Sequence, residues 1–115
     1  MENRAAAFLG RKPRVLYVDD ERDNLTGFKY MFRRIYELDL AQSAAEALQL
    51  LGQKEFDVII TDQRMPNMTG VEFLEKTLVD HPDTARMILT GYSDIEAVIE
   101  AINKGKIYYY FKKPW

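Results

Sequence analysis

Residues Val58–Gly70 read VIITDQRMPNMTG, and the fold of this chain is predicted first from this segment. It begins with apolar and β-branched residues that run without polar alternation into Asp62. Such a run is typical of a strand buried on both faces of a parallel sheet. Pro66 and Gly70 predict a loop directly after it. Open α/β sheets bind their ligands at the carboxyl ends of central strands, so Asp62 either caps a turn or belongs to a ligand site.

Length and composition limit the classes of protein to consider. The chain has 115 residues, 47% of them hydrophobic and 30% charged, with a formal net charge of −2. These values are typical of one globular domain and argue against a nucleic-acid-binding surface. The absence of cysteine excludes a disulfide framework and a thiolate metal site. No apolar run is long enough to span a membrane, and the opening residues lack a secretion signal, so we expect a cytoplasmic protein.

On both sides of this central strand, the sequence alternates strand-like and helix-like segments. Three further short apolar runs predict strands at Arg14–Val18, Arg86–Thr90 and Ile107–Phe111. The segment Glu37–Ala41 alternates polar and apolar residues, which predicts a half-buried strand at an edge of the sheet. A helix of about four turns is expected between the first two strands, with Leu25, Phe28, Phe32 and Ile35 on its apolar face. This alternation favours right-handed crossovers and a parallel sheet covered on both faces, an α/β fold.

Three capping boxes predict where the other helices begin. They are Ser43–Glu46, Thr69–Glu72 and Ser93–Glu96, each with a hydroxyl and a carboxylate three residues apart. The apolar faces behind them are predicted to be Ala44, Ala47, Leu48 and Leu51, then Val71, Leu74 and Leu78, then Ile95, Val98, Ile99 and Ile102, with Gly105 ending the last helix. We expect residues 1–13 to form a loose or weakly helical leader and residues 14–115 to form the domain.

Polar residues gather where the predicted strands end. Asp19 and Asp20 follow the first strand, Asp62 ends the central one, Thr90 ends the fourth and Lys113 follows the fifth. In a parallel sheet these ends share one edge, and three carboxylates there would repel one another strongly. Mg²⁺ accepts an open site of carboxylates and water, and a lysine with a hydroxyl suits a phosphoryl anion. Asp62 would then be the nucleophile.

Each of these residues also has a plainer interpretation. An Asp-Asp pair after a strand is often a helix cap, Thr-Gly is ordinary turn chemistry, and a Lys-Pro pair is usually solvated. Independent accidents would not all fall at strand ends in this order. The joint pattern favours a phosphoryl site.

Four segments together resemble the receiver domain of two-component response regulators. They are VDDE at Val18–Glu21, TDQRMPNMTG at Thr61–Gly70, LTGYSD at Leu89–Asp94 and YFKKPW at Tyr110–Trp115. The resemblance extends from Arg14 to Trp115 and implies a flavodoxin-like, doubly wound sheet of five parallel strands in the order 2-1-3-4-5. It also implies a final helix, which this chain lacks after its last strand.

The resemblance also implies a role for each site residue. Asp62 is expected to be the phosphoacceptor, with Mg²⁺ as the cofactor. The metal ligands would be Asp20 and Asp62 directly, Asp19 through water, and the backbone carbonyl of Arg64. Lys113 and Thr90 would contact the phosphoryl group, and Tyr110 matches the aromatic switch position.

The function that the resemblance implies is signalling by population shift. Phosphorylation would draw Thr90 toward Asp62 and let Tyr110 turn, which remodels the surface of the fourth helix and fifth strand. The expected partners are a sensor histidine kinase or phosphotransfer protein, and an output domain C-terminal to Trp115 or on a partner protein. A homodimer through the fourth helix and fifth strand, or through the flank that the missing helix would cover, is a further option, and we expect no direct contact with nucleic acid and none with a membrane. The domain would catalyse only its own phosphotransfer and dephosphorylation.

Two departures and two alternatives remain. Arg64 and Tyr92 are bulky at positions that in this family flank the path of the attacking water, which predicts a long-lived phosphoryl group. The combination of DQRMP, LTGYSD and KPW resembles receivers attached to larger regulators. One alternative is a degenerate receiver that dimerises without phosphorylation. The other is a haloacid-dehalogenase-like phosphatase, although Asp19-Asp20-Glu21 lacks the Asp-x-Asp pattern of that class and the short chain leaves little room for its cap.

Overall fold

The computed structural model describes residues 10–91 and 94–104, together with the backbone of 109–112. Strands and helices alternate along this chain, as the sequence predicts. The elements are β1 (Arg14–Val18), α1 (Arg22–Phe32), β2 (Glu37–Ala41), α2 (Ala44–Leu51), β3 (Val58–Asp62), α3 (Gly70–Asp80), β4 (Ala85–Thr90), α4 (Ile95–Asn103) and β5 (Tyr109–Lys112). Strand β4 begins one residue earlier than expected, and the described part of β5 begins at Tyr109 rather than Ile107.

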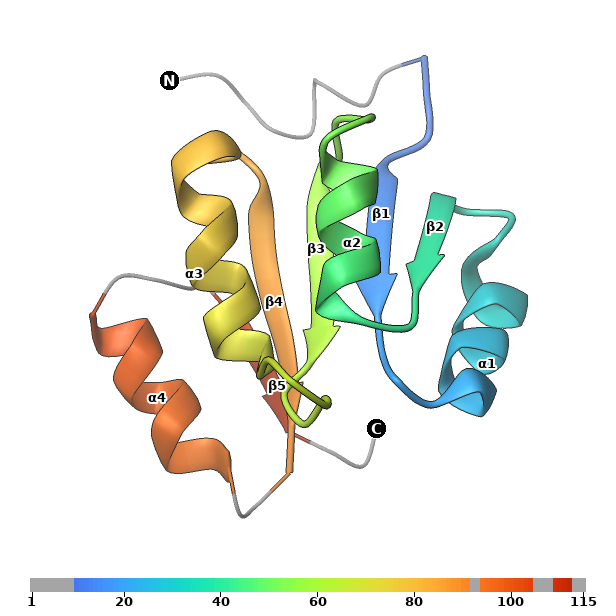
Figure 1. The fold of residues 1–115 in the computed structure, drawn as a ribbon. Coiled ribbons are helices and arrows are strands. Elements are labelled where there is room, and N and C mark those ends of the chain that lie inside the picture. The colour runs from blue at the N-terminus through green and yellow to red at the C-terminus, as the bar shows by residue number, and fades with distance from the viewer. Residues whose placement is uncertain (1–9, 92–93, 105–108, 113–115) are drawn as a thin grey trace.

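The five strands form one parallel sheet in the order β2-β1-β3-β4-β5 (Figure 1). Val18 at the end of β1 is aligned with Ala41 on one side and Thr61 on the other. Asp62 is aligned with Leu89, and Thr90 with Lys112. The carboxyl ends of the strands therefore meet at one edge, and the predicted α/β fold and strand order are confirmed.

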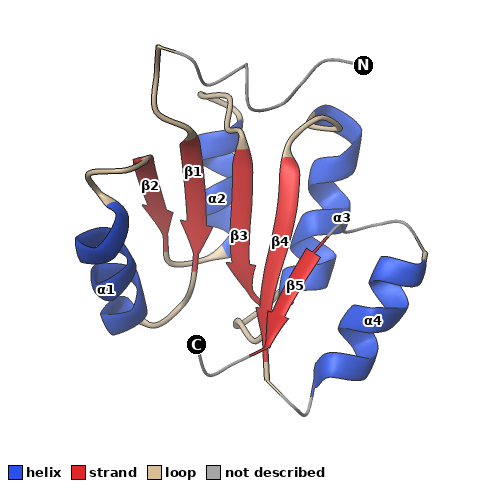
Figure 2. Ribbon diagram, turned by 180° about the vertical axis from the view of Figure 1, so that it is seen from behind, coloured by secondary structure: helices blue, strands red, loops and turns tan. Residues whose placement is uncertain are grey.

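The helices are divided unequally between the two faces of the sheet. Helices α2, α3 and α4 pack on one face, where their buried residues join Leu16, Ile59 and Ile88 of the strands in the main core. Helix α1 packs on the other face, where Leu25 meets Tyr17 and Leu89 in a smaller cluster (Figure 2). Each strand alternates between these two faces, so Tyr17 and Asp19 both lie on the α1 side.

Helix α1 is shorter than the sequence predicts. It ends at Phe32, about three turns after it begins, and the backbone N–H groups of Ile35 and Tyr36 both bond back to the Phe32 carbonyl in a turn. The chain has to reverse there because Glu37 pairs with Pro13 to begin β2. Ile35 consequently lies outside the helix with its side chain 55% exposed. Its placement on the apolar helix face was wrong.

The apolar faces of α3 and α4 are also shifted from their predicted positions. In α3 the buried residues are Gly70, Phe73, Leu74 and Thr77, whereas Val71 and Leu78 are half-buried. In α4 the buried residues are Val98 and Ala101, whereas Ile99 is 39% exposed. In each helix, fewer of the predicted apolar residues are fully buried against the sheet than the sequence pattern indicates. Phe73, fully buried in the main core, was missed.

The capping predictions had three different outcomes. Thr69 and Glu72 form a complete capping box at α3. At α2, Ser43 accepts from the Glu46 backbone N–H, but the Glu46 carboxylate accepts from Gln42 instead of Ser43. At α4 the residue before the first turn is Asp94, which makes no side-chain cap bond. Ser93 and Gly105 lie outside the described residues.

An ion pair fastens the segment before β1 to the residue before β3, at the end of the sheet away from the acid-bearing strand ends. Arg11 makes two hydrogen bonds to the Asp57 carboxylate, at 2.8 and 3.1 Å, and the Arg14 backbone N–H donates to the same group. Residues 10–13 are therefore held against the sheet, although the predicted leader–domain boundary itself stays a prediction and residues 1–9 lie outside the description. None of the described helices combines the length and apolar character that crossing a membrane requires.

Candidate functional site

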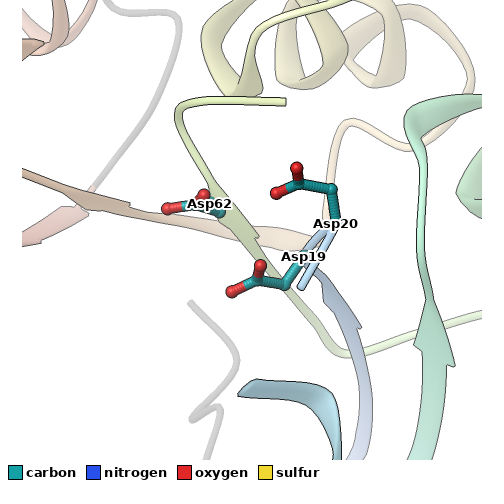
Figure 3. A group of neighbouring side chains, drawn as sticks. All are labelled: Asp19, Asp20 and Asp62. Atoms are coloured by element: carbon teal, nitrogen blue, oxygen red, sulfur yellow. The ribbon is translucent and has the colours of Figure 1, made fainter. Parts of the chain in front are cut away.

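Three carboxylates meet at the carboxyl ends of β1 and β3. Val18 is aligned with Thr61 in the sheet. Asp19 and Asp20, which follow Val18, therefore lie beside Asp62, which follows Thr61. One oxygen from each of the three acids lies within 4.8 Å of the others. Figure 3 shows the three carboxyl groups together at the strand ends. The sequence predicted this cluster, and the parallel register of the sheet explains it.

Asp19 is the most enclosed of the three acids. It has no exposed surface, and three donors hold its carboxylate. The Tyr17 hydroxyl donates to Oδ2 at 2.8 Å, the Asn24 side-chain amide donates to Oδ2 at 3.1 Å, and the Glu21 backbone N–H donates to Oδ1 at 2.9 Å. Hydrogen bonds of this kind offset the cost of burying a charge.

Tyr17 keeps its proton beneath the cluster. Burial of its ring raises the pKa of its hydroxyl well above the ordinary value, and the hydrogen bond to Asp19 and the negative charges of Asp19, Asp62 and Glu21 raise that pKa further. The phenol therefore stays neutral and able to donate. From the sequence, Tyr17 was predicted only as part of a buried strand, because strand periodicity does not encode the side-chain geometry that brings its hydroxyl to Asp19.

Asp62 is the last residue of β3 and is buried, with 6% of its surface exposed. The start of α3 approaches it so closely that a Cβ on Gly70 would overlap the Asp62 carbonyl oxygen. Gln63 fixes this approach, since its carbonyl accepts from the Gly70 N–H and its side-chain oxygen accepts from the Val71 N–H, both at 2.9 Å. Gly70 and Gln63 are thus site residues that sequence reasoning missed, although the glycine had been noted as a loop former.

Asp20 and Thr90 complete the described part of the edge. Asp20 is exposed at the mouth of the cluster. Thr90 is almost fully buried at the end of β4, one residue beyond Leu89, the partner of Asp62 in the sheet. Its hydroxyl donates to the Gly91 carbonyl at 3.3 Å. The predicted hydroxyl therefore lies on the strand next to Asp62.

Arg64 connects this edge to α4. Its Nε donates to Oδ2 of Asp94 at 2.8 Å, with the arginine side chain 73% exposed and the aspartate side chain 22% exposed. The role of the Arg64 backbone carbonyl as a metal ligand stays a prediction, and the ion pair of the Arg64 side chain was not predicted from the sequence. The backbone of Tyr110 lies in β5 beside Ile88, whereas the Tyr110 side chain, Tyr92 and Lys113 lie outside the described residues.

The donor set fits a hard divalent cation. The repulsion between carboxylates this close is on the order of 1 kcal/mol or more for each pair. A cation that prefers oxygen ligands removes that repulsion. The cluster combines buried acids, held by the fold, with the exposed acid Asp20. This arrangement leaves room for the water that Mg²⁺ usually retains.

The family model of the response regulator receiver domain matches residues 15–115. The chain belongs to this family. Receiver domains are the phosphoacceptor signalling domains of two-component systems, and this membership decides against the haloacid-dehalogenase-like phosphatase.

Curated relatives of this receiver domain are much longer proteins. The hydrogenase transcriptional regulatory protein HoxA of Cupriavidus necator is 39% identical over 101 residues, which cover 88% of this chain and 21% of HoxA. The transcriptional regulatory protein ZraR of Klebsiella oxytoca is 31% identical over 104 residues, 90% of this chain and 24% of ZraR. The chain thus spans between a fifth and a quarter of these relatives.

Solved structures share the fold. The signal receiver domain of an HD domain-containing protein from Pseudomonas fluorescens is 37% identical with a TM-score of 0.83, covering 91% of this chain and 85% of that one. The chemotaxis protein CheY4 of Vibrio cholerae is 30% identical with a TM-score of 0.81, covering 90% and 88% of the two chains. These likenesses agree with the flavodoxin-like sheet order.

Proposed function

We propose that Asp62 accepts a phosphoryl group from a histidine kinase or phosphotransfer protein while Asp19, Asp20 and Asp62 hold Mg²⁺. The observation that carries the proposal is the approach of the three carboxylates to within 4.8 Å at the carboxyl edge of the sheet. Membership of the receiver family gives this cluster its chemical interpretation.

In the proposed reaction, a carboxylate oxygen of Asp62 attacks the phosphorus of a phosphohistidine. The new O–P bond forms as the N–P bond breaks, and the electron pair of that bond returns to the imidazole nitrogen. Asp62 reacts as the anion, so no proton has to leave it. Mg²⁺ supplies positive charge that neutralises the phosphoryl oxygens and the acids around them.

Other residues of the same edge contribute to the proposal. We propose that Thr90 donates its hydroxyl to the phosphoryl group once that hydroxyl gives up its bond to the Gly91 carbonyl. We assign Lys113 as the cation that pairs with the phosphoryl oxygens, Tyr110 as the switch residue, and the backbone carbonyl of Arg64 as a further metal ligand. These three assignments follow from the sequence motifs.

The proposed output is control of a larger regulator. HoxA and ZraR are transcriptional regulatory proteins in which the matching region is a minor part of the chain. We therefore propose that phosphorylation of this domain controls an output domain, or dimerisation through α4 and β5. Its only catalysis would be its own phosphotransfer and dephosphorylation.

The decisive experiment is intact-mass measurement after incubation with Mg²⁺ and acetyl phosphate. Wild type should gain the mass of one phosphoryl group, and the gain should disappear with EDTA or in Asp62→Asn. Asp23→Asn is the matched control, because Asp23 is an exposed acid of α1 outside the cluster, and it should be phosphorylated normally. A folded wild-type protein that gains no mass would instead support a phosphorylation-independent dimerisation module.

A further inference from the structure

The hydroxyl of Tyr17 contacts the acid cluster from inside the sheet. It donates to Asp19 Oδ2 at 2.8 Å from a fully buried ring. We propose that Tyr17 is a positioning residue of the cation site. Its hydrogen bond sets the orientation of Asp19 and thereby the affinity of the site for a divalent cation. The inference rests on the proposed function, because it assigns Tyr17 a part in the same metal site.

The donors around Asp19 determine which of its oxygens remains available. A carboxylate oxygen has about two lone pairs to offer. Oδ2 accepts from Tyr17 and Asn24, whereas among the described residues Oδ1 accepts from the Glu21 backbone N–H alone. We therefore expect Asp19 to present Oδ1 to a cation or to its bound water. Loss of the Tyr17 bond would leave Oδ2 with one donor, so that two donors instead of three would fix the orientation of the carboxyl group.

The position of the Tyr17 hydroxyl is itself fixed by packing. Its ring stacks on Phe28 of α1, with centroids 4.2 Å apart and planes inclined by 22°. Phe28 in turn contacts Phe32, with centroids 4.7 Å apart, and Phe32 contacts Tyr36 at 5.7 Å. Asp19 directly follows β1 and lies two residues after Tyr17, so the alternation of the strand puts both side chains on the same face. The hydroxyl is thus held at one end of an aromatic row that runs along α1.

Packing alone does not account for a tyrosine here. A phenylalanine would make the same stacking contact, whereas a buried hydroxyl is costly unless it is hydrogen-bonded. The partner that satisfies it is an acid of the proposed metal site. Hydrogen bonds to metal-ligating carboxylates typically change metal affinity by about 10- to 100-fold when they are removed.

The test is Mg²⁺ binding by Tyr17→Phe, measured by isothermal titration calorimetry and by the Mg²⁺-dependent shift of the unfolding temperature. We expect affinity to fall about 10-fold while metal-free protein keeps a cooperative unfolding transition. Tyr36→Phe is the matched control, since it removes a hydroxyl from the far end of the same aromatic row, and it should bind Mg²⁺ as wild type does. A Tyr17→Phe affinity within twofold of wild type would overturn the proposal.

A double mutant separates positioning from general weakening. In Asp19→Asn the target of the Tyr17 bond is changed, so adding Tyr17→Phe should lower Mg²⁺ affinity no further; an equal loss in both backgrounds would overturn the proposal. If Asp19→Asn does not fold, Asn24→Ala replaces it, because Asn24 donates to the same oxygen and its removal should also weaken Mg²⁺ binding; unchanged affinity there counts against the proposal.

The outcomes also distinguish this inference from the proposed function. Wild type that neither binds Mg²⁺ nor accepts a phosphoryl group overturns both. Wild type that does both, beside a Tyr17→Phe variant with unchanged Mg²⁺ affinity, overturns only the role of Tyr17.

Discussion

Arg64 and Asp94 join the loop after β3 to the start of α4 through a hydrogen-bonded ion pair of 2.8 Å. Asp94 occupies the position that normally caps the helix, yet its side chain makes no cap bond. Its carboxylate is engaged by an arginine two residues beyond the proposed phosphoacceptor. Movement of Arg64 would therefore displace Asp94 at the start of α4. Helix α4 is part of the surface that we propose changes on phosphorylation.

Removal of the Arg64 side chain should shorten the life of the phosphoryl group. In Arg64→Ala we expect the half-life of the adduct to fall several-fold, because a bulky side chain no longer restricts water near Asp62. Intact mass followed over time after removal of acetyl phosphate measures it, with Arg34→Ala as the control at an exposed arginine of the α1–β2 turn. A wild-type half-life of seconds, or an unchanged half-life in Arg64→Ala, would contradict the expectation.

The Arg64–Asp94 pair should be easy to break. Because the arginine is 73% exposed, the coupling between the two residues should be about 0.2–1 kcal/mol and should shrink with salt. A double-mutant cycle with Arg64→Gln and Asp94→Asn, read as free energy of unfolding at low and high ionic strength, measures the coupling. A larger value that does not respond to salt would mean that the pair is a fixed structural element.

Two glycine-to-alanine substitutions should have opposite effects. Gly70→Ala should destabilise the fold by about 1–3 kcal/mol and reduce phosphoryl uptake, because the new Cβ must displace the Asp62 carbonyl. Gly27→Ala lies within α1, where the new Cβ meets no atom within 4 Å, and should stabilise the fold by roughly 0.5–1 kcal/mol. Denaturant unfolding measures both. Equal effects would show that the approach of α3 to Asp62 can relax without cost.

Asp20→Asn should affect stability differently with and without metal. Removal of one of three neighbouring charges should raise the free energy of unfolding of metal-free protein by about 1 kcal/mol, since Asp20 is exposed and the repulsion is screened. The same variant should lose most of the stabilisation that Mg²⁺ gives to wild type. Thermal unfolding in EDTA and in Mg²⁺ tests both, with Glu55→Gln as an exposed acid outside the cluster. A metal-free Asp20→Asn less stable than wild type would refute the argument.

The α3 capping box should make stability depend on pH. The Thr69 backbone N–H, together with the Thr69 side chain, holds the pKa of Glu72 below its usual value. A carboxyl whose pKa is lowered by folding stabilises the folded state above its unfolded pKa, and that contribution disappears as pH falls through the folded pKa. Glu72→Gln should therefore be less stable than wild type at neutral pH, with the difference closing on acidification. Urea midpoints measured from neutral to acidic pH give the comparison, and a difference that stays constant would rule out this origin.

The strand ends could be predicted from sequence, whereas the side chains around them could not. Uninterrupted apolar runs located β1 and β3, and the parallel arrangement then placed Asp19, Asp20 and Asp62 together. The bond from Tyr17 to Asp19 depends on a rotamer and on stacking against a helix, and neither is visible in hydrophobic periodicity. The sequence predicted the three carboxylates of the site, but it did not predict the groups that donate hydrogen bonds to them.

The errors in the helices have a similar origin. Ile35 and Ile99 fit a helical period, but periodicity does not say where a helix must stop or how wide a stripe the sheet can cover. The end of α1 is set by the start of β2 through the bond from Glu37 to Pro13. Phe73 lies on the buried face directly beside Leu74. Counting apolar residues at intervals of three and four from Val71 and Leu74 does not reach Phe73, so the pattern missed it.

The order of strands has a consequence for how the protein acquires its activity. β1 lies between β2 and β3, so its two neighbours pair with opposite sides of it. The acid cluster exists only once β3 has paired with β1, and closing the long intervening loop for a parallel pair is intrinsically slow. A signal that reports Mg²⁺ binding during refolding would therefore time this single pairing step, and a nascent chain that has not yet completed β3 has no cluster to titrate.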